Sequence, residues 1–175
     1  MIETKRLLIR KFLVTDAADL YEYLSLPEIY EFEPGGPITL EEAQGMSASR
    51  AAGDGFYAVV LKETQKMVGH LYFAQIEPKE FLTWELGYIF NPKYQNNGYA
   101  SESARALIEY GFAYMGIHRV EAYCNPLNVA SWRVMEKIGM RREALLIKHA
   151  FFHRNPDESP IWIDSYGYGM LKEDL

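Results

Sequence analysis

The chain has 175 residues, of which 49% are hydrophobic and 14% aromatic, a composition that excludes a disordered chain and suffices for a sizeable core. Its 18 Lys and Arg against 24 Asp and Glu give a formal net charge of −6, which disfavours nucleic acid as a partner and favours a cationic one. We therefore expect a single domain over residues 1–175.

The sequence also bears on the compartment. Cys124 is the only cysteine, so no internal disulfide bond can form, which fits a reducing compartment. The stretch MIETKRLLIRKF mixes charged with apolar residues, unlike a signal peptide, and no run approaches the ~20 apolar residues of a membrane helix. We expect a cytoplasmic protein without a membrane or a nucleic acid among its partners.

The first half of the chain predicts four strands and two helices. Strands are expected over 6–12, 56–62, 67–76 and 81–90, with helices from about 16 to 24 and over 40–52. The last three of these strands follow one another through short turns, which is typical of an antiparallel meander. A turn-rich loop over 27–39 separates the two helices and carries three glutamates, Glu28, Glu31 and Glu33.

The second half alternates between the two kinds of element. Helices are expected over 100–115 and 128–139, and strands over 118–124, 141–152 and 161–171. The strand 81–90, the helix after it and the strand 118–124 form a βαβ unit, which makes one strand pair parallel. The predicted fold class is α/β (α+β), with a mixed, mostly antiparallel sheet of about seven strands and helices on both faces.

The turn before the helix 100–115 is the first candidate site. Its residues are Gln95, Asn96, Asn97, Gly98, Tyr99 and Ala100. Asn and Gly tolerate the left-handed backbone of a concave turn, and the following helix would direct its free N–H groups into it, which suits a diphosphate. An ordinary strand-to-helix turn explains the same residues. Neither GxGxxG nor GxxxxGK[ST] is present.

Four blocks of the chain resemble one family. Residues Gln95 to Glu102 look like the acetyl-CoA pyrophosphate loop of the GNAT N-acetyltransferases, and 125–140 is similar to their N-x-x-S-x-x-[VL]-x-x-K-x-G helix. The stretches 3–21 and 84–95 resemble the Rim-type branch, which acetylates N-terminal amines of ribosomal proteins and also includes enzymes with other substrates. The blocks occur in the family's order.

The resemblance implies a splayed GNAT-type sheet and an acetyl-CoA-dependent N-acetyltransferase. Acetyl-CoA would act as co-substrate without a metal ion, and the acceptor, a primary amine, would attack directly in a ternary complex. A protein N-terminal amine is the acceptor that the Rim-type branch suggests. Small-molecule amines, such as a polyamine, amino acid or aminoglycoside, are the alternative, and a non-catalytic CoA-binding sensor is another. The sequence leaves open whether the protein is a monomer or a homodimer.

The resemblance also assigns residues to CoA. The backbone of Ile89 and Phe90 would pair with the pantetheine arm, and Asn128 would hydrogen-bond to it. Trp132 and Lys137 would line or flank the CoA, although core packing and a solvated face explain them equally well. The diphosphate would be held by the turn residues listed above, from Gln95 to Ala100, together with Ser101. Asn97 departs from the family, which often has Lys or Arg there, so one phosphate-facing cation is expected to be missing.

Ser131 and Glu85 are the candidate catalytic residues. The resemblance places Ser131 near the sulfur as proton donor to the departing thiolate, although Asn128 and Ser131 could equally form a helix cap. Glu85 could deprotonate the amine, or form a cross-strand ion pair instead.

Three other side chains are weaker candidates for the base: Glu33, His149 and His118. Glu33 and its two neighbouring glutamates could alternatively attract a cationic acceptor from the loop 27–39. His149 and His153 have a spacing that suits zinc on a helix, but their segment alternates as a strand and offers no third ligand, so no metal is expected.

Overall fold

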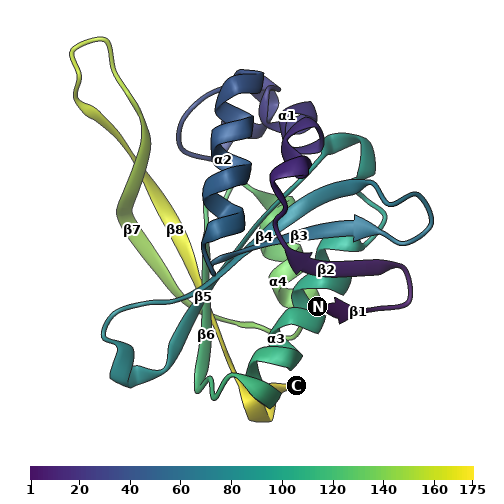
Figure 1. Cartoon of the computed structure of the whole chain (residues 1–175). Helices are drawn as coiled ribbons and strands as arrows, with labels where there is room; N and C mark the ends of the chain where they lie inside the picture. Colours follow the sequence, from purple (N-terminus) through teal and green to yellow (C-terminus); the bar gives the residue numbers. More distant parts are fainter.

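The computed structural model describes residues 1–175 and contains one mixed sheet with helices on both faces (Figure 1). The strands are β1 (Ile2–Glu3), β2 (Leu7–Lys11), β3 (Phe56–Leu61), β4 (Met67–Gln75), β5 (Thr83–Phe90), β6 (Arg119–Cys124), β7 (Arg141–Arg154) and β8 (Pro160–Leu171). The α-helices are α1 (Ala17–Leu24), α2 (Leu40–Ala52), α3 (Tyr99–Tyr114) and α4 (Val129–Lys137). Short 3-10 turns are η1 (Val14–Asp16), η2 (Pro27–Glu31), η3 (Lys79–Phe81), η4 (Pro92–Tyr94) and η5 (Lys172–Asp174).

The sheet has the order β1-β2-β3-β4-β5-β6-β8-β7. Only the β5–β6 pair is parallel, as the βαβ unit predicted. Every expected helix and strand is present, with bounds shifted by a residue or two. The eighth strand, β1, was not expected, because two residues are too few to show a period. The last strand in the chain, β8, lies between β6 and β7 instead of at the edge.

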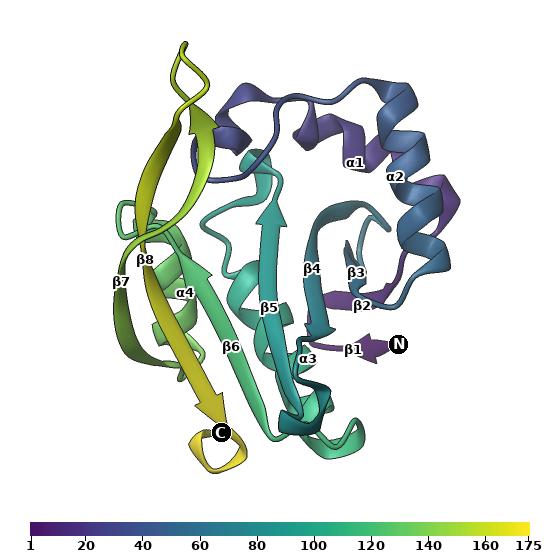
Figure 2. The same ribbon diagram turned by 90° about the vertical axis from the view of Figure 1, so that its left-hand side faces the viewer.

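The helices cover the two faces of the sheet in pairs (Figures 1 and 2). On one face α3 and α4 pack on the central strands through a cluster that includes Leu107, Ile108, Phe112, Met135, Phe73, Leu86 and Val120. On the other face α1 packs on β3 and β4 through a smaller cluster that includes Leu20, Tyr23, Leu24, Ala58, Val60 and Met67, with α2 beside it. The buried faces of α1, α3 and α4 therefore pack on the sheet.

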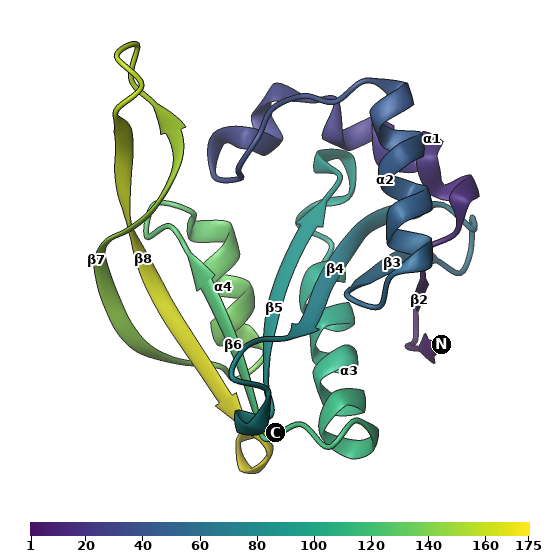
Figure 3. The same ribbon diagram turned by 60° about the vertical axis from the view of Figure 1, so that its left-hand side comes forward.

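The β7–β8 hairpin extends past the end of the sheet and twists away from it (Figures 1 and 3). The register between the two strands shifts between Leu146 and Ala150, which is typical of a bulge that bends the ribbon. His153 Nε2 on the hairpin donates a hydrogen bond to the carbonyl of Tyr30 in η2 at 3.1 Å. The hairpin and η2 thus meet at one end of the sheet.

A buried polar pair attaches α1 to the sheet. Tyr23 on α1 and His70 on β4 are both buried, and Tyr23 Oη lies 2.6 Å from His70 Nδ1. Burial lowers the pKa of His70 well below its usual value, with the charge of Arg50 acting in the same direction, so the imidazole is neutral. The hydrogen bond satisfies two groups that water cannot reach.

We expect Tyr23→Phe to destabilise the fold, because it leaves His70 Nδ1 buried without a partner. The cost should be about 1–3 kcal/mol in the free energy of unfolding. Tyr21→Phe is the matched control, since Tyr21 is exposed on the same helix and its hydroxyl makes no hydrogen bond; it should change the free energy by less than ~0.5 kcal/mol. Urea unfolding measures both, and equal values for the two variants would contradict the expectation.

Candidate active site

The parallel pairing of β5 with β6 stops part-way along the two strands. The paired residues are Thr83, Trp84 and Glu85 with Arg119, Val120 and Glu121. Beyond Glu85 the two strands separate, and in Figure 3 they diverge toward the end of the molecule where the β7–β8 hairpin rises. This separation is the splay that the resemblance predicted, and it opens a gap in the middle of the sheet.

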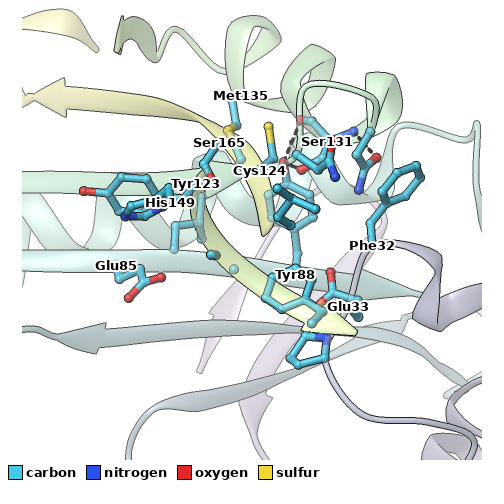
Figure 4. Close-up of a pocket in the computed structure, with 18 residues that line it drawn as sticks. Phe32, Glu33, Glu85, Tyr88, Tyr123, Cys124, Ser131, Met135, His149 and Ser165 are labelled. Carbon is cyan, nitrogen blue, oxygen red and sulfur yellow. Dashed lines mark hydrogen bonds between the residues drawn. The ribbon is translucent and has the colours of Figure 1, made fainter. Parts of the chain in front are cut away.

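The gap contains a cavity of about 330 Å³ (Figure 4). Its walls come from five places: β5, β6, the start of α4, the β7–β8 hairpin and the loop after η2. The lining residues are Phe32, Glu33, Pro34, Glu85, Leu86, Gly87, Tyr88, Tyr123, Cys124, Asn125, Asn128, Ser131, Met135, His149, Ala150, Phe152, Ile163 and Ser165. The cavity therefore brings together Ser131, Asn128 and Glu85 from the predicted site, with the weaker candidates Glu33 and His149.

The backbone of β5 directs peptide groups into the gap, where the Phe90 carbonyl accepts a hydrogen bond from Gln95 Nε2 at 3.2 Å. Asn91 N–H, just after β5, donates to Val68 O of β4 at 2.9 Å. Alternate residues of an antiparallel strand direct both peptide groups to the same neighbour, so those of Ile89 also point to β4. The peptide groups of Tyr88 and Phe90 point into the gap. Phe90 thus fits its expected contact with a pantetheine arm, and Tyr88 is better placed for the second contact than Ile89.

Ser131 and Tyr88 form a hydroxyl pair at one end of the cavity. Tyr88 Oη donates to the carbonyl of Ser131 at 2.8 Å and lies 3.2 Å from Ser131 Oγ (Figure 4). Burial is the largest cause of the raised pKa of Tyr88, so its hydroxyl keeps its proton. Tyr88 was not among the predicted site residues. Its position in the block Glu85-Leu86-Gly87-Tyr88 was visible, but its contact across the gap with α4 was not.

Asn128 has the capping role that the sequence allowed. Its Oδ1 accepts a hydrogen bond from Ser131 N–H at 3.1 Å, so Asn128 is the N-cap of α4. Its Nδ2 group donates no hydrogen bond within the chain and belongs to a residue that lines the cavity. Capping and ligand binding are therefore compatible, because they use different atoms of one side chain.

Two carboxyl groups lie in the cavity wall, and neither forms a salt bridge. Burial raises the pKa of Glu33 to about 7. Burial also raises the pKa of Glu85, and the like charge of Glu121 on β6 adds to the effect. The alternative interpretation of Glu85 as a cross-strand ion pair is wrong, since its neighbours across the sheet are Ala74 and Glu121. Glu33, with its pKa of about 7, can take up a proton near neutral pH.

The remaining candidates for a base divide into two groups. His149 lines the cavity, and its ring lies 5.5 Å from that of Tyr123. His118 lies outside it, beside the paired ends of β5 and β6. Of the three glutamates in the loop 27–39, only Glu33 reaches the cavity, while Glu28 and Glu31 are exposed.

The turn before α3 forms a concave row of free donors. Asn96 and Gly98 have φ values of 60° and 78°, in the left-handed region that Asn and Gly tolerate. The backbone N–H groups from Asn96 to Ser101 donate no hydrogen bond within the chain, and Tyr99 is the first residue of α3. Such a row at a helix N-terminus is suited to an anion. The turn therefore offers the free donors that a diphosphate would need, and its role in CoA binding stays a prediction.

Two cations lie beside this turn. A Cβ atom on Gly98 would be 3.6 Å from Arg6 Nη2 and 3.7 Å from Lys137 Nζ. Arg6 is also bonded to Glu102 in the first turn of α3, whereas Lys137 at the end of α4 forms no salt bridge. The positive charge that Asn97 does not provide is thus supplied by residues far away in the sequence.

Trp132 does not line the cavity. Its ring packs against the core, 5.4 Å from the guanidinium carbon of Arg142. Because Trp132 is not among the residues that line the cavity, the cavity does not support its expected contact with CoA. The surroundings of Trp132 favour a role in core packing.

Neither a metal cluster nor a membrane-spanning helix is found. No group of three or more His, Cys, Asp or Glu side chains is arranged to hold a metal ion. No helix combines the length and the apolar character needed to cross a bilayer.

Known proteins resemble the chain over nearly its whole length. The N-acetyltransferase YnaD of Bacillus subtilis (strain 168) is 41% identical over 175 residues, which cover 99% of this chain and 98% of YnaD. The crystal structure of a GNAT-family acetyltransferase from Bacillus anthracis has a TM-score of 0.88 and 40% identity, with 98% of each chain covered.

More distant structures share the fold alone. Ribosomal-protein-S5-alanine acetyltransferase from Vibrio fischeri has a TM-score of 0.81 at 19% identity over 98% of this chain and 96% of its own. Spermidine N-acetyltransferase from Vibrio cholerae, solved in complex with CoA and spermine, has a TM-score of 0.79 at 15% identity over 98% of both chains. These neighbours have different acceptors, and the Rim-type branch is not confirmed by them.

The family of the chain follows from a match of residues 6–141 to the acetyltransferase (GNAT) domain. The matched residues include the turn before α3, the gap between β5 and β6 and the start of α4. The chain is therefore an acetyltransferase of the GNAT family.

Proposed function

We propose that this acetyltransferase transfers an acetyl group from acetyl-CoA to a primary amine, by direct attack within a ternary complex. The observation that carries the proposal is the cavity at the β5–β6 gap, which has a hydroxyl pair at one end and two unpaired carboxyl groups in its wall. The family implies acetyl-CoA, which would supply an acetyl thioester to the cavity.

The residues present fit CoA along the gap. The N–H groups from Asn96 to Ser101, with Arg6 and Lys137 beside them, would hold the diphosphate. The peptide groups of Tyr88, the N–H of Phe90 and the Nδ2 of Asn128 would hold the amides of the pantetheine arm. A backbone N–H of β5 facing the gap would stabilise the negative charge that develops on the carbonyl oxygen.

Two protons have to be moved. Ser131, hydrogen-bonded to Tyr88, is proposed to donate a proton to the leaving thiolate, with Tyr88 orienting the Ser131 hydroxyl. Glu33 is the proposed base, because its pKa of about 7 allows it to take a proton from an ammonium group near neutral pH. Glu85, at the other end of the cavity in Figure 4, would then bind the acceptor by its charge, or act as base itself.

The cavity favours a cationic acceptor. It is lined by Glu33 and Glu85 and by no lysine or arginine. A protein N-terminal amine fits this site and needs little help from a base, because its pKa is ~7.7–8.0. The second unpaired carboxyl specifically favours the other candidate, a small amine with two positive charges, such as a polyamine.

The first experiment measures free-thiol release from acetyl-CoA with two acceptor pools, one of peptides with free N-termini and one of polyamines and amino acids. Wild type should turn over one pool, and Ser131→Ala should lower kcat by about 10²-fold or more. Ser49→Ala, exposed on α2, is the matched control and should behave as wild type. CoA binding without thiol release on either pool would favour a sensor and contradict the proposal.

The pH profile should identify the base. With an acceptor of pKa ~10.4, such as a lysine side chain, kcat/KM of wild type should rise with pH through about 7, because Glu33 acts only when ionised. Glu33→Gln should lower the plateau by about 10²-fold and remove that inflection. Glu31→Gln, exposed on the same loop, should keep both. An inflection near 7 that persists in Glu33→Gln would assign the base to another residue.

CoA binding should depend on the backbone at Gly98. Gly98→Ala puts a methyl group on the concave turn at φ +78°, a conformation that costs about 1–2 kcal/mol for other residues, so we expect the Kd of CoA to rise about tenfold. Gly116→Ala has the same left-handed strain, at φ +67°, but open space around it, and should lower stability without changing the Kd. Calorimetry measures both, and equal Kd values would exclude the turn from the binding site.

A further inference from the structure

Glu22 on α1 joins three segments that meet at the end of β5. Its carboxylate accepts hydrogen bonds from Asn91 Nδ2 at 3.2 Å and from Lys93 Nζ at 3.0 Å. It also accepts a hydrogen bond from the Nζ of Lys66, the residue just before β4. These bonds lower the pKa of Glu22 to about 2, with the Lys66 bond as the largest cause, so the group is ionised. Glu22 does not line the cavity, and the chemistry proposed above makes no use of it.

Asn91 is the buried centre of this arrangement. It is fully buried, and each polar group of the residue has a partner. Its N–H donates to Val68 O at 2.9 Å, its Oδ1 accepts from Lys93 N–H at 3.1 Å, and its carbonyl accepts from Tyr94 N–H at 2.8 Å. The side-chain Nδ2 depends on Glu22 alone. Without that carboxylate, a donor in the interior would have no acceptor.

The bonds of Asn91 set the position of the turn that follows. Its Oδ1 and carbonyl hold the two amides that begin η4. From η4 the Tyr94 carbonyl accepts a hydrogen bond from Asn97 Nδ2 at 3.2 Å, and Gln95 Nε2 returns to the Phe90 carbonyl at 3.2 Å. A contiguous set of hydrogen bonds therefore leads from α1 to the free N–H groups that begin at Asn96.

We propose that Glu22 is a positioning residue for the diphosphate turn: by fixing Asn91 and η4, it holds the N–H groups from Asn96 to Ser101 in the arrangement that binds CoA. The inference rests on the proposed function, since it takes CoA to be the ligand of that turn. Glu22 acts through other residues and contacts no reacting atom.

A substitution at Asp19 serves as the control that distinguishes positioning of the turn from a general role in stability. It lies one turn earlier on α1, binds the same Lys66 at 2.7 Å and accepts a hydrogen bond from Met67 N–H at 2.9 Å. It has no contact with Asn91 or with η4. Asp19→Ala therefore removes a similar carboxylate from the same helix and leaves the hydrogen bonds that lead to the turn intact.

The experiment compares Glu22→Ala, Glu22→Gln and Asp19→Ala in the full chain. Glu22→Ala should raise the Kd of CoA and the KM of acetyl-CoA about tenfold and change kcat by less than about twofold. Asp19→Ala should leave both constants unchanged. Glu22→Gln, which keeps an acceptor for Asn91 Nδ2, should recover part of the affinity.

A truncated donor tests whether the effect belongs to the diphosphate. Acetylpantetheine lacks the diphosphate, so Glu22→Ala should leave its kcat/KM at the wild-type value. In the free protein, hydrogen exchange at the Lys93 and Tyr94 amides should become faster in Glu22→Ala and not in Asp19→Ala. This measurement reports on the hydrogen bonds that hold η4 when no ligand is bound.

Two results would overturn the proposal. One is an unchanged Kd of CoA in Glu22→Ala, with a loss of stability equal to that of Asp19→Ala. The other is an equal loss of kcat/KM on acetyl-CoA and acetylpantetheine, which would place the effect in β5 and not in the turn. Failure of the proposed function differs from both, because it would appear in wild type as an absence of CoA binding or of thiol release.

Discussion

The site depends on one constraint, which is that the parallel ladder between β5 and β6 ends at Glu85 and Glu121. Beyond that pair, the peptide groups of Tyr88 and Phe90 face a gap, and buried peptide groups need hydrogen-bond partners. An extended ligand with its own amide groups can take the place of the missing strand. The same break in the sheet therefore leaves peptide groups of β5 without a neighbouring strand and opens a gap in which an extended ligand can bind to them.

The start of α4 shows how one local structure serves both folding and chemistry. A helix N-terminus needs an acceptor for its first N–H groups, and Asn128 provides it with Oδ1 while its Nδ2 remains free. The cap also determines the direction of Ser131, whose hydroxyl meets Tyr88 across the gap. The sequence pattern allowed either a helix cap or a ligand contact for Asn128. The structure makes both roles possible at once, because they use different atoms of the side chain.

Local signals predicted most of the fold. The helix 100–115, the successive strands and the Asn-Gly turn before α3 are encoded by residues close together in the sequence, and all are found. The features that were missed depend on distant contacts: the insertion of β8 between β6 and β7, the two cations beside Gly98, and the burial of Glu33 in the cavity wall. The catalytic roles of Glu85 and Ser131 remain predictions.

The net charge of −6 does not describe the field within the site. Arg6 and Lys137 lie at the turn before α3, where a helix N-terminus adds partial positive charge, while Glu33 and Glu85 lie in the cavity at the β5–β6 gap. A polyphosphate would thus be attracted to the turn and an ammonium group to the cavity, and each would be repelled from the other's place. This polarity would orient both substrates before any chemistry begins, so that the amine waits in the acidic cavity where the thioester would enter.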